Sequence, residues 1–130
     1  CFGRPPAPAK DWIIGLQNPR AETVLKRIKL NDFSIATSGD YRRYAESEGK
    51  KYSHILNPAT GDSANELISV TILAPTAMEA DALSTAVSVM GKQRGLALID
   101  SLDEAEALLI TADRPDELIQ TSRAADFLID

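Results

Sequence analysis

The feature of the sequence that most restricts its fold is the apolar run from Leu67 to Leu73, LISVTIL. The run is rich in β-branched residues and almost continuously apolar, which is typical of a strand buried on both faces near the centre of a sheet. The segment Thr76-Ala77-Met78-Glu79 follows and matches a capping box. Apolar residues then recur at helical spacing, which predicts a helix from about Pro75 to Met90 with Gly91 as its stop.

Several strands are predicted before this run, and two helices, a strand and a tail after it. This order favours an α+β fold, with a mixed, mainly antiparallel sheet flanked by helices, over an alternating βαβ arrangement. The remaining expected elements are strands at Trp12 to Gln17, Thr23 to Leu30 and Phe33 to Thr37, a tight break at Ser38 to Asp40, a hairpin of Tyr41 to Glu46 with Tyr52 to Leu56, a short helix at Gln93 to Ile99, a core strand at Ala107 to Thr111, a helical turn at Pro115 to Gln120, and a last segment at Phe127 to Ile129.

Length and charge narrow the classes of function. A chain of 130 residues is expected to form one domain. Its 14 basic and 19 acidic residues give a net charge of -5, which argues against a nucleic-acid partner, because phosphate binding needs clustered Lys and Arg. The sequence has no GxGxxG motif and no P-loop, so nucleotide binding by those two devices has no support. With Cys1 as the one cysteine, neither an intrachain disulfide nor a cysteine-based zinc site can form.

His54 is the only histidine and is the candidate catalytic residue. It lies at the end of a predicted strand, just before the turn Asn57 to Gly61, where Thr60 and Gly61 are candidates for holding backbone N–H groups against a phosphate. The alternative is a histidine that is hydrogen-bonded for structural reasons only.

Asp81 and Thr85 are the candidate metal ligands. They are four residues apart, so they share one face of the predicted helix, and their oxygens can converge on one point. Mg²⁺ prefers oxygen ligands and is often held by one or two protein groups while substrate phosphates and water complete its shell. The alternative is a solvated helix face on which Asp81 favours the helix dipole.

Thr37, Ser38, Gly39, Asp40 and Tyr41 form a candidate flavin-binding turn. Small hydroxyl groups, a glycine that allows close backbone approach, and an aromatic ring suit a flavin or a nucleotide. The same residues also suit an ordinary hairpin turn, and composition does not separate the two.

Four segments, taken in order, resemble the ApbE family of flavin transferases. The motifs that carry the resemblance are the W-x-I-G-I-Q-x-P strand, the T-S-G-D-Y turn, the H-I-x-D-P-x-T-G segment and the A-D-A-L-S-T-A helix, which correspond here to Trp12 to Pro19, Ala36 to Tyr41, His54 to Gly61 and Glu79 to Ala86. Asn57 departs from the pattern, in which Asp is more frequent. The resemblance covers nearly the whole chain but corresponds to the C-terminal half of family members, so an upstream half is expected to complete the flavin pocket.

The resemblance implies an enzyme that moves FMN from FAD onto a threonine hydroxyl of a target flavoprotein and releases AMP. It implies FAD and Mg²⁺ at the site, Asp81 and Thr85 as metal ligands, and His54 as a base or orienting group. Some relatives hydrolyse FAD to FMN and AMP instead. The sequence also leaves open a module that binds or delivers FAD without catalysis, and a structural domain whose site has decayed.

The resemblance also implies a periplasmic or cell-envelope setting in a bacterium, with membrane attachment only through a lipid anchor outside this chain. Under this interpretation Cys1 is not a lipidated terminus, because Trp12 lies in the middle of the family pattern.

Overall fold

The structure is a computed structural model that describes residues 5–39, 44–47, 50–53 and 55–129. Its strands form three antiparallel sheets in the orders β1-β2-β9, β3-β6-β7-β8 and β4-β5. The elements are β1 (Trp12–Gln17), β2 (Val24–Leu30), β3 (Ser34–Gly39), β4 (Tyr44–Ser47), β5 (Lys50–Ser53), β6 (Leu67–Ala74), α1 (Ala77–Asp100), β7 (Glu106–Thr111), β8 (Ile119–Gln120), η1 (Ala124–Phe127) and β9 (Leu128–Ile129). The α+β class predicted from the sequence is confirmed.

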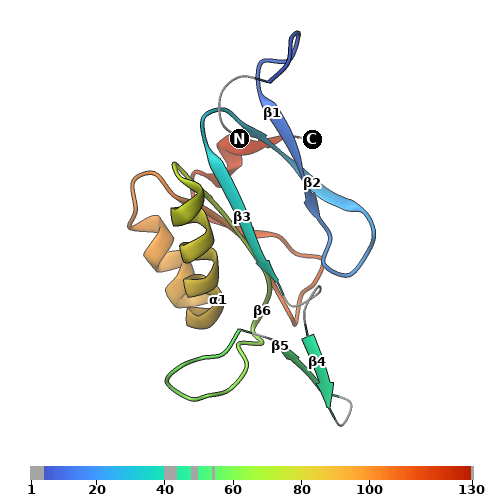
Figure 1. The fold of residues 1–130 in the computed structure, drawn as a ribbon, viewed down its shortest axis with the longest axis vertical. Helices are drawn as coiled ribbons and strands as arrows, with labels where there is room; N and C mark the ends of the chain where they lie inside the picture. Colours follow the sequence, from blue (N-terminus) through green and yellow to red (C-terminus); the bar gives the residue numbers. More distant parts are fainter. Residues whose placement is uncertain (1–4, 40–43, 48–49, 54, 130) are drawn as a thin grey trace.

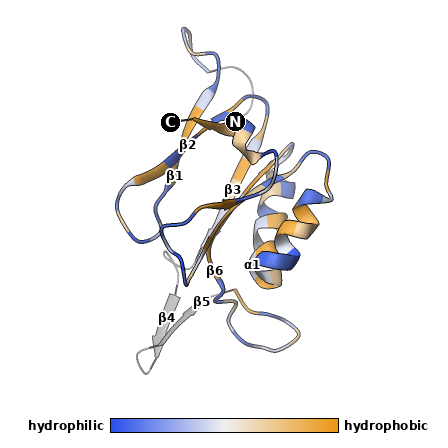
Figure 2. Ribbon diagram, turned by 180° about the vertical axis from the view of Figure 1, so that it is seen from behind, coloured by the Kyte–Doolittle hydropathy of each residue, from blue (hydrophilic) through white to orange (hydrophobic). Residues whose placement is uncertain are grey.

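The four-stranded sheet lies between two layers, with α1 on one face and the β1-β2-β9 sheet on the other (Figure 1). Every residue of β6 is buried, because alternate side chains enter two different cores. Val70 and Ile72 pack in the core beneath α1, whereas Leu73 packs with Ile28 and Leu30 of β2 in the second core. Figure 2 shows the resulting concentration of hydrophobic residues along the inner strands.

The helix α1 begins as its sequence predicts. Thr76 is its N-cap: the Thr76 hydroxyl accepts from the Glu79 N–H at 3.2 Å, and the Thr76 N–H donates back to the Glu79 carboxylate at 3.2 Å. Gly91, with φ 80° and ψ 175°, interrupts the helical backbone. The expected stop at Gly91 and the expected second helix are therefore both present, as two helical segments that lie side by side in Figure 1.

Two local expectations were wrong. Ser38 and Gly39 do not form the expected break, because β3 continues through Gly39, which pairs with Ser69 of β6; Asp40 lies outside the described residues. The helical turn expected at Pro115 to Gln120 is a loop followed by the short strand β8, which pairs with Leu108 and Leu109 of β7. In both places, pairing with a strand distant in the sequence overrides the local turn signal.

Candidate functional site

Asp81 and Thr85 lie one turn apart on α1, and both side chains are exposed. The Thr85 hydroxyl donates to the backbone carbonyl of Asp81 at 3.3 Å. A hydroxyl has one hydrogen and two lone pairs, so this bond turns the hydrogen toward the helix and leaves the oxygen able to accept a cation. The exposed Asp81 carboxylate and Thr85 hydroxyl thus have the donor chemistry of a partial magnesium shell, with the other ligand positions left to groups outside the helix.

Ser84 joins this helical turn to the end of β3. Its side chain is fully buried. The Ser84 hydroxyl lies 2.8 Å from the Ser38 hydroxyl and donates to the carbonyl of Asp81 at 2.9 Å. The bond places Ser38, one of the predicted flavin-binding residues, next to the turn that carries Asp81.

The other predicted flavin-binding residues of β3 are arranged differently. The Thr37 hydroxyl bonds the Thr71 hydroxyl of β6 at 2.7 Å, and because successive side chains alternate along a strand, it points to the face opposite Ser38. Gly39 ends the strand. Asp40 and Tyr41 lie outside the described residues, as does the candidate catalytic residue His54.

The turn that contains Thr60 and Gly61 is closed by its own hydrogen bonds. The Gly61 N–H donates to the Asn57 carbonyl at 2.8 Å, and the Asp62 N–H donates to the Thr60 hydroxyl at 3.2 Å. The Ala59 N–H donates to the Asn57 side chain at 3.0 Å. These N–H groups, which the sequence suggested for phosphate binding, are thus engaged inside the turn. Gly61 has φ 76°, a conformation that favours glycine.

The loop that carries this turn lies below α1 in Figure 1, after β5. No hydrogen bond between described residues connects the turn to Asp81 or Thr85. The structure therefore brings together Ser38, Asp81 and Thr85, and it leaves Thr60 and Gly61 on a separate segment.

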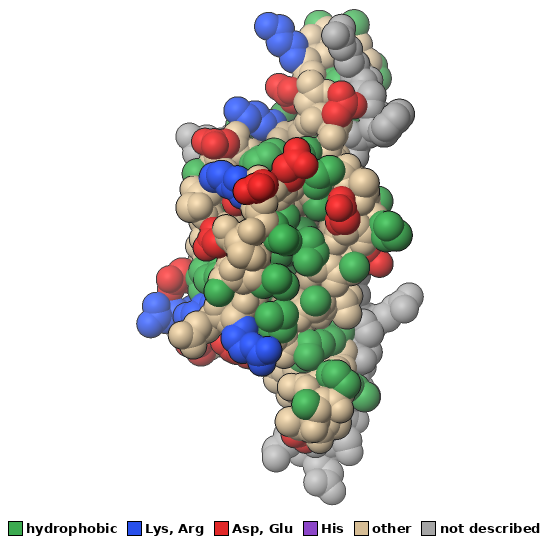
Figure 3. Space-filling model, turned by 90° about the vertical axis from the view of Figure 1, so that its left-hand side faces the viewer, with side chains coloured by type: hydrophobic (Ala, Val, Ile, Leu, Met, Phe, Trp, Pro, Cys, Tyr) green, Lys and Arg blue, Asp and Glu red, His purple; other side chains and the backbone are tan. Residues whose placement is uncertain are grey.

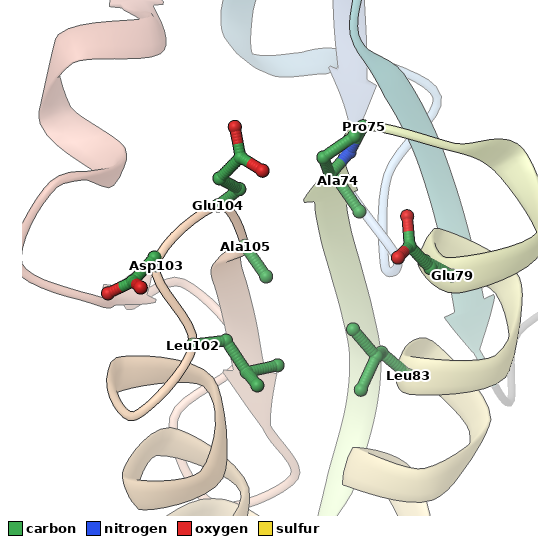
Figure 4. Close-up of a pocket in the computed structure, with 8 residues that line it drawn as sticks. All are labelled: Ala74, Pro75, Glu79, Leu83, Leu102, Asp103, Glu104 and Ala105. Carbon is green, nitrogen blue, oxygen red and sulfur yellow. The ribbon is translucent and has the colours of Figure 1, made fainter.

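A pocket of about 210 Å³ lies elsewhere, between the end of β6, the first turns of α1 and the loop before β7 (Figure 4). Leu83 and Leu102 face each other across it, and Glu79, Asp103 and Glu104 supply carboxylates at its rim. Figure 3 shows acidic side chains gathered at this end of the helical face. The Glu79 carboxylate already caps α1, accepting from the Thr76 hydroxyl at 2.7 Å. Neither Asp81 nor Thr85 lines the pocket, so it is separate from the candidate site.

Within the described part of the chain, no three His, Cys, Asp or Glu side chains are grouped to hold a metal ion. Nor does that part contain a helix that is both long and apolar enough to cross a membrane.

Sequence reasoning missed Ser84. It assigned the helical stripe from apolar residues alone, although Ser84 lies four residues after Ala80 and three before Val87, all on the buried face. A hydroxyl residue inside a buried stripe is the signal that would have identified it, because a buried hydroxyl requires a partner.

The chain resembles known proteins in both sequence and structure. The model of the ApbE family matches residues 1–109. FAD:protein FMN transferase of Vibrio cholerae is 39% identical over 105 residues, which are 78% of this chain and 31% of that protein. The protein of the same name from Escherichia coli K12 is 41% identical over 86 residues, covering 64% of this chain and 24% of its own length.

Two solved structures support the same relationship. The ApbE protein of Thermotoga maritima superimposes with a TM-score of 0.86 at 37% identity, covering 98% of this chain and 41% of that chain. The flavin transferase ApbE of Vibrio cholerae gives a TM-score of 0.79 at 33% identity over 97% of this chain and 40% of its own. The chain thus spans about a third of the length of the curated relative from Vibrio cholerae. Because the family model covers most of these 130 residues, the chain belongs to the ApbE family.

Proposed function

We propose that this chain forms one wall of the active site of a Mg²⁺-dependent enzyme that transfers FMN from FAD to a threonine of an acceptor flavoprotein. The observation that carries the proposal is the hydrogen bond between Ser38 and Ser84, which sets the end of β3 beside the helical face of Asp81 and Thr85. That juxtaposition offers a diphosphate both a strand end to lie against and two oxygen ligands for its cation. The names of the relatives support the coarser part of this proposal, which is the transfer of FMN from FAD to a protein.

In the proposed reaction, the threonine oxygen forms a bond to the phosphorus of the FMN moiety, and the bond from that phosphorus to the bridging oxygen breaks. AMP leaves, and the threonine proton passes to a base, for which His54 is the candidate through the family resemblance. Mg²⁺, when bound, supplies neutralisation of charge on the diphosphate. Asp81 and Thr85 would hold it, and Ser38 and Gly39 would lie alongside the flavin nucleotide.

The replacement of Asp81 by Asn tests this proposal in the complete enzyme, with FAD, an acceptor that contains the target threonine, and a titration of Mg²⁺. We expect the Mg²⁺ concentration for half-maximal transfer to rise at least ten-fold, because one anionic ligand is lost, and a ten-fold change corresponds to about 1.4 kcal/mol. Mass spectrometry of the acceptor measures the transfer.

Glu104→Gln is the matched control, since it removes the same charge at the rim of the separate pocket. Equal metal dependence in the Asp81 variant, the Glu104 variant and the parent would remove Asp81 from the site. FMN and AMP without modified acceptor would identify FAD hydrolysis, with water as the nucleophile. Tight FAD binding with neither product would identify a binding or delivery module.

We also propose that the site is completed by an upstream segment of the same protein, in a periplasmic or cell-envelope setting. Two protein oxygens on an exposed helical face cannot fill the six positions that Mg²⁺ requires, and a ligand of the size of FAD needs most of its surface enclosed. We therefore expect residues 1–130 alone to bind FAD weakly and to transfer no FMN. The protein that includes the upstream segment should bind FAD tightly and transfer FMN. Fluorescence quenching of FAD measures the binding, and full transfer by the short chain would contradict the proposal.

A further inference from the structure

We propose that Ser84 is a positioning residue, which sets the distance between the end of β3 and the metal-binding turn of α1. The inference rests on the proposed function, because it concerns the same site. Ser84 itself is fully buried and cannot contact a ligand. Any effect that it has on metal binding or on transfer must therefore pass through its hydrogen-bonded neighbours.

The place of Ser84 in the helix needs an explanation. Ala80, Ser84 and Val87 are all fully buried where α1 packs on the sheet. An alanine at position 84 would suit this stripe and would avoid burying a hydroxyl, which is costly unless the hydroxyl is bonded. Two bonds offset that cost here, one to the Ser38 hydroxyl at 2.8 Å and one to the Asp81 carbonyl at 2.9 Å.

The direction of these bonds follows from the number of hydrogens. Ser84 has one hydroxyl hydrogen and donates it to the Asp81 carbonyl, so Ser38 must donate to Ser84. The chain of bonds thus runs from β3, through Ser84, to the backbone of Asp81. The Thr85 hydroxyl donates to the same carbonyl at 3.3 Å. The carbonyl oxygen of Asp81 therefore connects both proposed metal ligands, through Ser84, to the strand.

The strand is held firmly enough for this bond to matter. On its opposite face, Thr37 bonds Thr71 at 2.7 Å, while Ser38 pairs with Val70 along β6. Apolar contacts between α1 and β3 tolerate sliding, whereas a hydrogen bond weakens steeply as its length and angle change. Among the described residues, the bond between Ser38 and Ser84 is the side-chain hydrogen bond that joins β3 to α1.

The consequence for the reaction is geometric. If Asp81 and Thr85 hold Mg²⁺ while the diphosphate lies against the end of β3, the two elements must keep a fixed separation. A displacement of about 1 Å at a reacting centre can lower a rate by roughly 10²-fold. Loss of the bond should therefore weaken Mg²⁺ binding and slow transfer, while FAD affinity changes less.

Ser84→Ala and Ser88→Ala form a matched pair for the test in the complete enzyme. Ser88 is almost as buried and lies one turn further on, but its hydroxyl donates only along the helix, to the Ser84 carbonyl at 2.8 Å. Calorimetric titration of Mg²⁺ into the FAD-loaded protein without acceptor measures metal affinity, and acceptor mass measures the rate. We expect Ser84→Ala to weaken Mg²⁺ binding by about ten-fold and to lower the maximal rate of transfer by a similar factor, with Ser88→Ala near the parent protein.

Ser38→Ala removes the same hydrogen bond by changing its partner on β3. If the bond is the cause, the double variant Ser38→Ala/Ser84→Ala should bind Mg²⁺ about as weakly as Ser84→Ala, because the second substitution removes nothing more. Additive losses, or equal effects of Ser84→Ala and Ser88→Ala, would overturn the positioning role while leaving the proposed function intact. If the parent enzyme transfers FMN without Mg²⁺, the proposed Mg²⁺-dependent function is wrong. The positioning role of Ser84 is then also wrong, because it concerns the same metal site.

Discussion

At the scale of single residues, the candidate site places one neutral hydroxyl pair beside one carboxylate. Ser38 bonds Ser84 next to the helical turn of Asp81, and neither hydroxyl carries a charge. Asp81 makes no ion pair with another described residue. Its charge therefore stays available to a cation, and no fixed positive group among the described residues pairs with it in place of that cation.

Thr85→Val and Thr85→Ser separate the hydroxyl of this residue from its shape. Valine has nearly the volume of threonine but no side-chain oxygen. We therefore expect the valine variant to need a Mg²⁺ concentration about ten-fold higher than the serine variant for half-maximal transfer, which corresponds to about 1.4 kcal/mol of metal-binding free energy. Because the position is exposed, stability should change by only about 0.5 kcal/mol in either variant. Mg²⁺ titration and urea unfolding of both proteins measure the two effects. Equal Mg²⁺ dependence in the valine and serine variants would exclude the hydroxyl as a ligand.

At the scale of secondary structure, local patterns predicted the elements whose causes are local. The strand β6 has a continuous apolar run, and the start of α1 has a capping box, so composition and spacing alone locate both. The glycine stop at Gly91 was likewise predictable, because few other residues adopt its positive φ.

Features that depend on distant partners could not be predicted in this way. The extension of β3 through Gly39 requires its pairing with Ser69, and β8 exists because it pairs with β7. The juxtaposition of Ser38 with Ser84 joins residues 46 positions apart. The sequence motifs named Ser38, Asp81 and Thr85 as separate candidates, but only the packing of α1 on the sheet brings them together.

Gly91→Ala should destabilise the chain at the junction of the two helical segments. The backbone there, with φ 80° and ψ 175°, lies in a region that is almost restricted to glycine and costs other residues about 1–3 kcal/mol. A β-carbon would also meet a carboxylate oxygen of Glu66, but this side chain is exposed and can move aside, giving up its bond from the Lys92 N–H at 3.3 Å. We expect the free energy of unfolding in urea to fall by about 2 kcal/mol, mainly from the backbone.

Two further variants separate the backbone and steric contributions to this loss of stability. Gly61→Ala also has a positive φ but meets no atom within 4 Å, so it should show the backbone cost alone. The double variant Gly91→Ala/Glu66→Ala should recover the part due to the collision. If Gly91→Ala unfolds at the same urea concentration as the parent, the geometry described for this junction is incorrect.

At the scale of the whole molecule, three layers depend on two cores that share the central strands. The C-terminal segment completes the second core, through Ala124 and Phe127, and it is tied to the loop between α1 and β7 by Arg123. The guanidinium of Arg123 donates to the carbonyls of Asp103 and Leu102 at 2.6 and 2.8 Å. It also forms an ion pair with the buried Glu106 at 2.7 Å, and Glu106 accepts from the Thr121 hydroxyl.

Arg123→Met should therefore loosen the attachment of the C-terminal segment to the sheet. Methionine keeps an apolar stem but leaves the Glu106 carboxylate buried without its cation and two carbonyls without their donor. Breaking a buried pair from one side costs about 3–5 kcal/mol, and because Arg123 itself is 47% exposed, we expect a smaller loss of about 2 kcal/mol in the free energy of unfolding. Arg114→Met is the control, because its ion pair with Glu117 is exposed on both sides and should contribute less than about 1 kcal/mol. Adding Glu106→Gln to Arg123→Met should recover part of the lost free energy of unfolding, since an uncharged amide is less costly to bury without a partner than a carboxylate is. Urea unfolding of the four proteins measures these differences, and equal losses in the Arg123 and Arg114 variants would show that the segment is held by its apolar contacts alone.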